Sequence, residues 1–175
     1  MDVRIREEMV EDRRAVAEVV EAAFESVEYS DHREHLLVER LRGSNAFIPQ
    51  LSLVADVAGA IVGHVLLTRA EIQGARPDVS LALAPLSVAP GYQRRGIGSQ
   101  LVVEAHRRAR LLGFEAIVVL GHAGYYPRFG YRPAKTLGIV MPFDVPDQNC
   151  MVVDLTDKGL SGMSGKVVYP PEFQL

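Results

Sequence analysis

The apolar positions of this chain recur with two different periods, and each period predicts a different element. Apolar residues at helical spacing predict helices over 16–24, 35–41 and 95–112, and Gly113 follows the last of them as helix-ending glycines often do. Alternating or continuous apolar residues predict strands over 3–6, 51–57, 59–72, 79–88, 114–120, 139–143 and 151–155. Helices and strands are interleaved along the chain, which predicts a mixed α/β fold.

The clearest unit in this pattern is a strand, a helix and a second strand over 79–120. A right-handed crossover of this kind makes the two strands parallel, and it places a ligand site at the carboxyl end of the first strand. Pro85 lies inside that first strand. Because proline has no N–H to donate to a sheet ladder, a bulge or a splay is expected there.

Composition and charge narrow the class of protein. The 175 residues suit one domain, and the net charge of −3 gives no electrostatic case for nucleic acid or an anionic membrane as partner. Cys150 is the single cysteine, so the chain has no internal disulfide. We find no signal-peptide pattern and no apolar run long enough to span a bilayer, so a cytoplasmic protein is expected.

The segment Gln93-Arg94-Arg95-Gly96-Ile97-Gly98 carries the strongest functional signal. Two glycines allow a ligand to approach the backbone closely, and Ser99 continues into the best predicted helix. Free N–H groups at a helix start, together with the positive end of the helix dipole, attract phosphate. The sequence therefore predicts a diphosphate site at this turn.

Other glycine-rich phosphate sites fit this segment poorly. A P-loop ends in Gly-Lys-Ser/Thr, whereas this chain has Gly96-Ile97-Gly98-Ser99 without a lysine. A dinucleotide site needs a third small residue, where Leu101 stands, and an acidic residue after the next strand, where Leu120-Gly121-His122 stands. The dinucleotide hypothesis stays open only as a minor alternative.

Two motifs together resemble those of the GNAT N-acetyltransferases. Gln93-x-x-Gly96-x-Gly98 is similar to the family's acetyl-coenzyme A motif, Gln/Arg-x-x-Gly-x-Gly/Ala. Tyr126-Pro127-Arg128-Phe129-Gly130-Tyr131 is similar to a second family motif, a tyrosine followed after three residues by Gly-Phe/Tyr. The predicted order of elements over residues 3–155 also matches the family. The resemblance implies the GNAT fold of small bacterial-type members, with a mixed central sheet and flanking helices.

The resemblance implies acetyl-CoA as co-substrate, with no metal. In the family, backbone N–H groups after the Gln/Arg hold the diphosphate, and the preceding strand pairs through its main chain with the pantetheine arm. These roles map onto Leu86, Ser87 and Val88 in the strand, and onto Gln93, Arg94, Arg95, Gly96, Ile97, Gly98 and Ser99 at the turn. An amide-bearing arm that adds to an open strand edge is physically reasonable.

The resemblance also implies roles for residues around the reacting groups. Tyr126 matches the family position for a general acid or a hydrogen-bond donor to the departing thiolate, although a one-residue shift of register would give that part to Tyr125. No acidic residue lies on the strand 81–88, so His122 is a candidate for the base or for holding a water. Glu28, Tyr29 and His32 lie in the segment that walls the acceptor side in this family.

These observations predict transfer of an acetyl group from acetyl-CoA to a small-molecule or peptide amine by direct attack. A GNAT domain over 1–157 is expected, with 158–175 as an extension packed on or extended from the same domain. The alternative to an enzyme is a non-catalytic module that binds or senses acyl-CoA without turnover. The acceptor is not identified by the sequence, and homodimer formation stays open.

Overall fold

The structure of the chain is a computed structural model that describes residues 1–158, 160 and 162–174. Its helices are α1 (Arg13–Phe24), α2 (Glu34–Arg42) and α3 (Ile97–Leu111). Its strands are β1 (Arg4–Glu7), β2 (Ser52–Val57), β3 (Ala60–Arg69), β4 (Glu71–Ile72), β5 (Ser80–Val88), β6 (Ala116–Leu120), β7 (Arg132–Pro133), β8 (Ile139–Val140), β9 (Cys150–Asp154) and β10 (Gly165–Val168). The mixed α/β fold predicted from the apolar pattern is confirmed.

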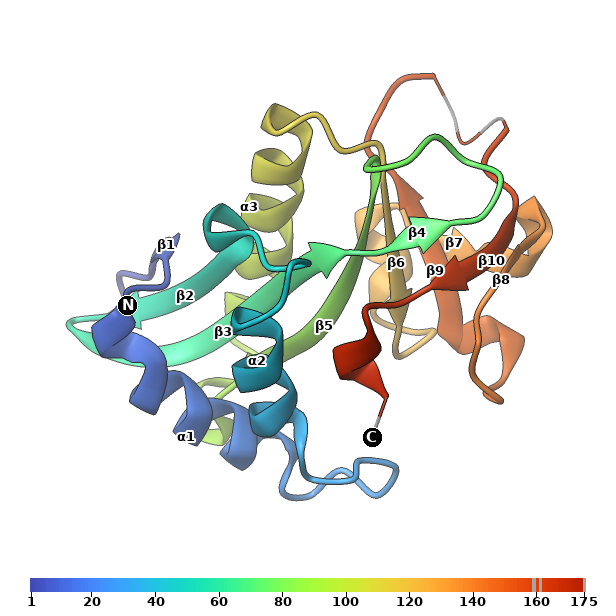
Figure 1. Cartoon of the computed structure of the whole chain (residues 1–175). Coiled ribbons are helices and arrows are strands. Elements are labelled where there is room, and N and C mark those ends of the chain that lie inside the picture. The colour runs from blue at the N-terminus through green and yellow to red at the C-terminus, as the bar shows by residue number, and fades with distance from the viewer. Residues whose placement is uncertain (159, 161, 175) are drawn as a thin grey trace.

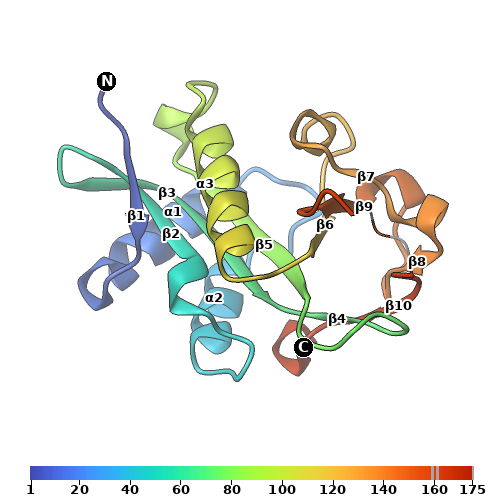
Figure 2. The same ribbon diagram turned by 90° about the horizontal axis from the view of Figure 1, so that it is seen from above.

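A seven-stranded mixed sheet in the order β1-β2-β3-β5-β6-β9-β7 forms the centre of the molecule. The strands β5 and β6 are parallel, as the crossover through α3 requires, and the other pairs are antiparallel. Helices α1 and α2 cover one face of the sheet, and α3 covers the other (Figures 1 and 2). Strands β4, β10 and β8 make a separate three-stranded sheet.

Two predicted strands differ from the structure. The strand predicted over 59–72 breaks after Arg69, because β4 leaves the large sheet and pairs with β10. The strand predicted over 139–143 is reduced to β8. The extension 158–175 includes β10, which pairs with β4 and β8 and buries Val167 completely. Only contacts with distant segments create β10, so local sequence could not predict it.

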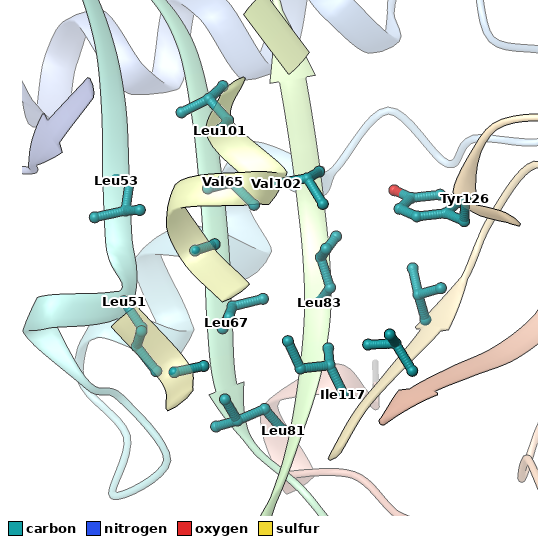
Figure 3. Close-up of a cluster of buried hydrophobic side chains, with 14 of the residues drawn as sticks. Leu51, Leu53, Val65, Leu67, Leu81, Leu83, Leu101, Val102, Ile117 and Tyr126 are labelled. Atoms are coloured by element: carbon teal, nitrogen blue, oxygen red, sulfur yellow. The ribbon is translucent and has the colours of Figure 1, made fainter. Parts of the chain in front are cut away.

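The main core lies between the sheet and α3. Leu53, Val65 and Leu83 from three neighbouring strands pack against Leu101 and other apolar residues of the helix. Figure 3 shows these side chains, with the ring of Tyr126 at the margin of the cluster. A second cluster beneath α1 and α2 covers the opposite face of the sheet. This double cover holds the carboxyl ends of the central strands in place.

The strand β5 pairs with β6 only along the first half of β5. Their register runs from Ser80 opposite Ala116 to Leu83 opposite Val119, and it ends there. Next to Pro85 the pairing of β5 with β3 also shifts register. In Figure 1 the two strands separate toward their carboxyl ends. The splay expected from Pro85 is thus present, and it opens one edge of β5.

A buried ion pair joins the end of β1 to α2. The side chains of Glu8 and Arg42 form a salt bridge, and each is 5% exposed. Burial by itself raises the pKa of Glu8, but contacts with His64, Ser52 and Arg42 outweigh burial and lower this pKa below its ordinary value of 4.5. The ionised carboxylate therefore stabilises the fold above pH 4.5, and this contribution is lost as the pH falls toward the lowered pKa.

Replacing Glu8 by Gln should lower the free energy of unfolding by about 3 kcal/mol at pH 7, because the variant removes the buried carboxylate that meets Arg42 and leaves this guanidinium only its pair with the more exposed Glu39. For a chain of this size the melting temperature falls by about 6–12 °C. Glu7→Gln is the control, since Glu7 is half-exposed and its pair with Arg108 is worth about 0.5 kcal/mol. Thermal melts should also show the difference between wild type and Glu8→Gln shrinking below pH 4.5. Equal melting temperatures at pH 7 would contradict the role of the pair.

Within the described residues, no helix combines the length and the apolar character needed to cross a bilayer.

Candidate active site

A cavity of about 500 Å³ lies where β5, the start of α3 and the loop after β6 meet. Most of the predicted phosphate-binding turn lines it, together with Tyr126 and Arg128 of the second motif and the preceding Tyr125. The lining residues are Leu86, Val88, Tyr92, Gln93, Arg94, Gly96, Ile97, Gly98, Ser99, His122, Tyr125, Tyr126 and Arg128. The fold thus brings together the two motifs that the sequence places about 30 residues apart.

The start of α3 offers unpaired backbone donors to this cavity. Gly96 is the N-cap residue with φ +79°, and no side chain caps the helix. The N–H of Gln100 bonds the carbonyl of Gly96 at 3.1 Å, so the N–H groups of residues 97–99 precede the first intrahelical bond. A Cβ built on Gly96 would meet no atom within 4 Å and would enter open space. The unpaired N–H groups at the positive end of the helix dipole and the open space beside Gly96 both suit an anionic group.

Three arginines of the two motifs take different positions around this anion site. Arg94 lines the cavity with φ +60°, whereas Arg95 does not line it and stacks over Tyr92 at 5.7 Å. Arg128 also lines the cavity, and its guanidinium lies 4.6 Å from the ring centre of Tyr125. Arg94 and Arg128 are therefore the cations available to a ligand phosphate.

The open edge of β5 forms one wall of the cavity. The N–H of Ala89 bonds the carbonyl of Val62 on β3 at 2.9 Å. Since backbone groups alternate between the two edges of a strand, those of Leu86 and Val88 face the open side and those of Ser87 face β3. Gln93 Nε2 donates to the carbonyl of Val88 at 3.0 Å, which agrees with this direction. Ser87 is buried and lines neither this cavity nor the one described below.

The two adjacent tyrosines point to different parts of the site. A Cβ on Gly98 would lie 2.8 Å from the hydroxyl of Tyr125, so Tyr125 reaches the start of α3. The ring of Tyr126 packs against the backbone of Gly121, where an added Cβ would come within 2.3 Å of Cε2. Tyr126 is 7% exposed, and burial raises its pKa above the ordinary range. Its hydroxyl therefore keeps its proton throughout the physiological pH range.

His122 follows β6 and lies beside Tyr126. Its Nε2 forms a hydrogen bond with the hydroxyl of Tyr29, and the two rings meet edge to face with centroids 5.6 Å apart. Tyr29 belongs to the segment between α1 and α2, so this contact joins that segment to the residues that follow β6. Burial raises the pKa of Tyr29, which keeps its hydroxyl protonated.

A second cavity of about 540 Å³ lies on the other side of Tyr126. Five residues line both cavities, namely Leu86, Val88, Gln93, His122 and Tyr126. The second cavity continues between α1 and α2 on one side and the C-terminal segment on the other, with Tyr29, Glu34, Phe143, Tyr169 and Phe173 in its walls. Two compartments thus meet at one tyrosine and one histidine.

The predicted acceptor-side residues do not all reach this second cavity. Tyr29 lines it, whereas Glu28 is exposed and lines neither cavity. The side chain of His32 turns back to the carbonyl of Phe24 at 3.0 Å and borders a separate acidic surface hollow. Glu34 and the three C-terminal aromatic residues were not predicted. In the sequence they look like an ordinary helix residue and ordinary core positions.

The comparisons with known proteins agree with this geometry. A family model described as acetyltransferase (GNAT) domain matches residues 49–133. The chain is 40% identical over 119 residues to the uncharacterized N-acetyltransferase YjhQ of Escherichia coli, an alignment that covers 67% of this chain and 66% of that relative. Residues 49–133, which the family model matches, contain both motifs described above.

Solved structures match over almost the whole chain. The GNAT family N-acetyltransferase YhbS of Escherichia coli, in complex with CoA, has a TM-score of 0.89 and 29% identity, covering 99% of this chain and 92% of that one. A GNAT family acetyltransferase of Brucella melitensis, in complex with acetyl-CoA, has a TM-score of 0.81 and 31% identity, covering 98% of each chain. The resemblance drawn from the two motifs is thus confirmed, and the chain belongs to the GNAT family of acetyltransferases.

Proposed function

We propose that this chain transfers an acetyl group from acetyl-CoA to a primary amine, by direct attack of the amine on the thioester. The observation that carries the proposal is the meeting of two cavities at Tyr126 and His122. One cavity has the donors and cations that a diphosphate needs, and the other is open to a second reactant. The CoA and acetyl-CoA complexes of the two related structures support the choice of co-substrate.

The cofactor-side residues fit acetyl-CoA in three respects. The N–H groups of residues 97–99 would bind the diphosphate, with Arg94 and Arg128 as counter-charges. The backbone groups of Leu86 and the N–H of Val88, which face the open edge, would pair with the amides of the pantetheine arm, while the carbonyl of Val88 bonds Gln93. The bound thioester supplies the activated acetyl group at the junction of the cavities.

Tyr126 would donate a hydrogen bond to the departing sulfur. The pKa of its hydroxyl is raised by burial, whereas an alkyl thiol has a pKa of about 8.5. Complete proton transfer from Tyr126 to the thiolate is therefore more costly than for an ordinary tyrosine. A hydrogen bond that strengthens as charge develops on sulfur supplies the stabilisation without that cost.

His122 would accept the proton of the incoming ammonium, either directly or through a held water. An alkylamine has a pKa of about 10.4 and must lose a proton before it attacks. His122 lines both cavities, and Tyr29 fixes the orientation of its ring. In the open half of β5, residues 84–88 offer no carboxylate for this task.

A covalent acyl-enzyme route has less support. Cys150, the only cysteine, is buried in β9 and lines neither cavity. Burial also raises the pKa of its thiol, which disfavours the reactive thiolate. Direct attack by the amine needs no such nucleophile.

Thermal shift and thiol release together test the proposal. Acetyl-CoA at 100 times its dissociation constant should stabilise the folded chain by about 2.7 kcal/mol, which corresponds to a rise in melting temperature of about 5–10 °C. NAD and ATP at the same concentration serve as controls, with little effect expected. Stabilisation by NAD alone would favour the dinucleotide alternative. Binding of acetyl-CoA without amine-dependent thiol release over a broad amine panel would favour a non-catalytic acyl-CoA-binding module.

A further inference from the structure

We propose that the acceptor is a monoamine carried on an aromatic or branched apolar body that bears no second charge. The inference rests on the proposed function and names the substrate class of the second cavity. It is drawn from the walls of that cavity, which combine one carboxylate with many apolar side chains.

The C-terminal half of the chain gives the second cavity an aromatic wall, formed by Phe143, Tyr169 and Phe173. The ring of Tyr169 lies between the other two, with centroids 5.0 Å from Phe143 and 4.9 Å from Phe173, in edge-to-face arrangement. Tyr169 Oη also donates to the sulfur of Met141 at 3.5 Å, which turns its polar end toward the protein. The wall therefore presents ring surface to a ligand, and edge-to-face packing extends readily to another aromatic ring.

The helical side of the lining is apolar as well. Phe24 at the end of α1, Val27 in the following segment and Leu37 on α2 line the cavity. Each of these side chains is half-buried, so apolar surface stays available to a ligand. A ligand body without polar groups gains about 25 cal/mol for each Å² that it removes from water here.

Among the residues that the structure describes, Glu34 is the only carboxylate side chain that lines this cavity, and neither lysine nor arginine lines it. It lies in the first turn of α2 and is half-buried. The hydroxyl of Ser30 donates to Oε1, so Oε2 is the oxygen that can meet a ligand cation. One carboxylate suits one ammonium group, and the hydrogen bond from Ser30 keeps its side chain in place.

This charge pattern disfavours two common classes of amine. A polyamine would bring a second ammonium group against an aromatic wall without a carboxylate to meet it. An amino acid would bring a carboxylate that finds no cation in this cavity. Burial of an unpaired charge costs several kcal/mol, so either substrate should lose much of its affinity. A monoamine with a ring or branched chain leaves no charge unpaired.

The experiment compares three amines at saturating acetyl-CoA, with thiol release measured against enzyme-free blanks and products identified by mass spectrometry. The amines are 2-phenylethylamine, phenylalanine, which has the same body plus a carboxylate, and spermidine. We expect kcat/KM for 2-phenylethylamine to exceed that of each of the others by about 100-fold or more. Phenylethylamine should also raise the melting temperature of the CoA-bound chain, a readout that needs no turnover.

Two variants with matched controls test the walls. Phe143→Ala should raise KM for 2-phenylethylamine about 10-fold, as expected for loss of an aromatic contact, while acetyl-CoA affinity stays unchanged. Val140→Ala is its control, because Val140 is exposed and lies near Phe143 in the chain but outside the cavity. Glu34→Gln should raise KM about 10-fold by removing the charge, and Glu21→Gln, exposed on α1, should not.

The outcomes separate this inference from the proposed function. Faster acetylation of spermidine or phenylalanine than of 2-phenylethylamine would overturn the inference and leave the acetyltransferase function intact. So would binding of acetyl-CoA without acetylation of any aromatic monoamine tried. Absence of acetyl-CoA binding would instead contradict the proposed acetyltransferase function. Equal effects of Phe143→Ala and Val140→Ala on KM would show that the aromatic wall does not contact the acceptor.

Discussion

Gly96→Asp should raise the dissociation constant for acetyl-CoA by about 100-fold or more, equivalent to about 2.8 kcal/mol. The new carboxylate stands at the N-cap of α3, where it can accept hydrogen bonds from the N–H groups that would bind the diphosphate. It also places a negative charge where the ligand is negative. The φ of +79° adds strain for any residue with a Cβ, which favours movement of the turn. Isothermal titration calorimetry measures the change directly.

Two further variants separate charge from strain. Gly96→Asn has nearly the same shape without the charge and should weaken binding by only about 10-fold. Gly113→Asp carries the same substitution at another glycine with positive φ, +89°, and open space around its Cβ, but at the far end of α3. Its affinity for acetyl-CoA should equal that of wild type. If Gly96→Asp folds normally and keeps wild-type affinity, the start of α3 does not hold the diphosphate.

Tyr126→Phe should lower kcat by about 100-fold or more, within the range seen when a general acid or a transition-state hydrogen bond is removed. The ring stays in the variant, so its packing on Gly121 and its edge-to-face contact with Tyr131 at 5.4 Å are retained. Acetyl-CoA affinity should therefore change little. Because burial raises the pKa of Tyr126, loss of its proton should not limit the wild-type rate anywhere below pH 10. Steady-state kinetics across pH 6–10 with acetyl-CoA titrations checks both points.

Tyr125→Phe is the matched comparison, since Tyr125 precedes Tyr126 and its hydroxyl lies at the start of α3. This variant should weaken acetyl-CoA binding a few-fold and leave kcat nearly unchanged. The opposite pattern, with kcat lost in Tyr125→Phe and kept in Tyr126→Phe, would exchange the roles of the two residues. The cavity geometry argues against that exchange, because Tyr126 lines both cavities whereas Tyr125 lines only the first.

The elements that depend on local pattern were predictable from the sequence. Helix α3 has a continuous apolar face and ends close to Gly113, so its predicted position was right to within two residues at each end. The splay after Leu83 was predictable because Pro85 removes a donor whatever its surroundings. Strand β10 was not predictable, since its short run of residues becomes a strand only through pairing with β4 and β8.

The same distinction holds for the site. The proposed diphosphate-binding turn occupies a few consecutive residues whose glycine spacing has a physical purpose, so the sequence alone is enough to propose it. The acceptor wall could not be predicted, because Phe143 and Phe173 are 30 residues apart and only the folded chain brings them to the same cavity. Glu34 likewise looks like one of many acidic helix residues until its cavity is seen.

The proposed acceptor cavity takes part of its lining from residues that precede β2 and from residues that follow β8, whereas the proposed cofactor cavity is lined by residues between these segments. In Figures 1 and 2 the C-terminal segment after β10 lies beside α2, where Arg40 Nε donates to the carbonyl of Glu172 at 3.2 Å. Residues 86–128 line the first cavity, while residues 23–37 together with Phe143, Tyr169 and Phe173 supply half of the residues that line the second. Under the proposed assignment, substitutions in these outer segments would alter acceptor choice without touching the acetyl-CoA site. Exchange of the outer segments around a constant centre would then be a route to new acceptors.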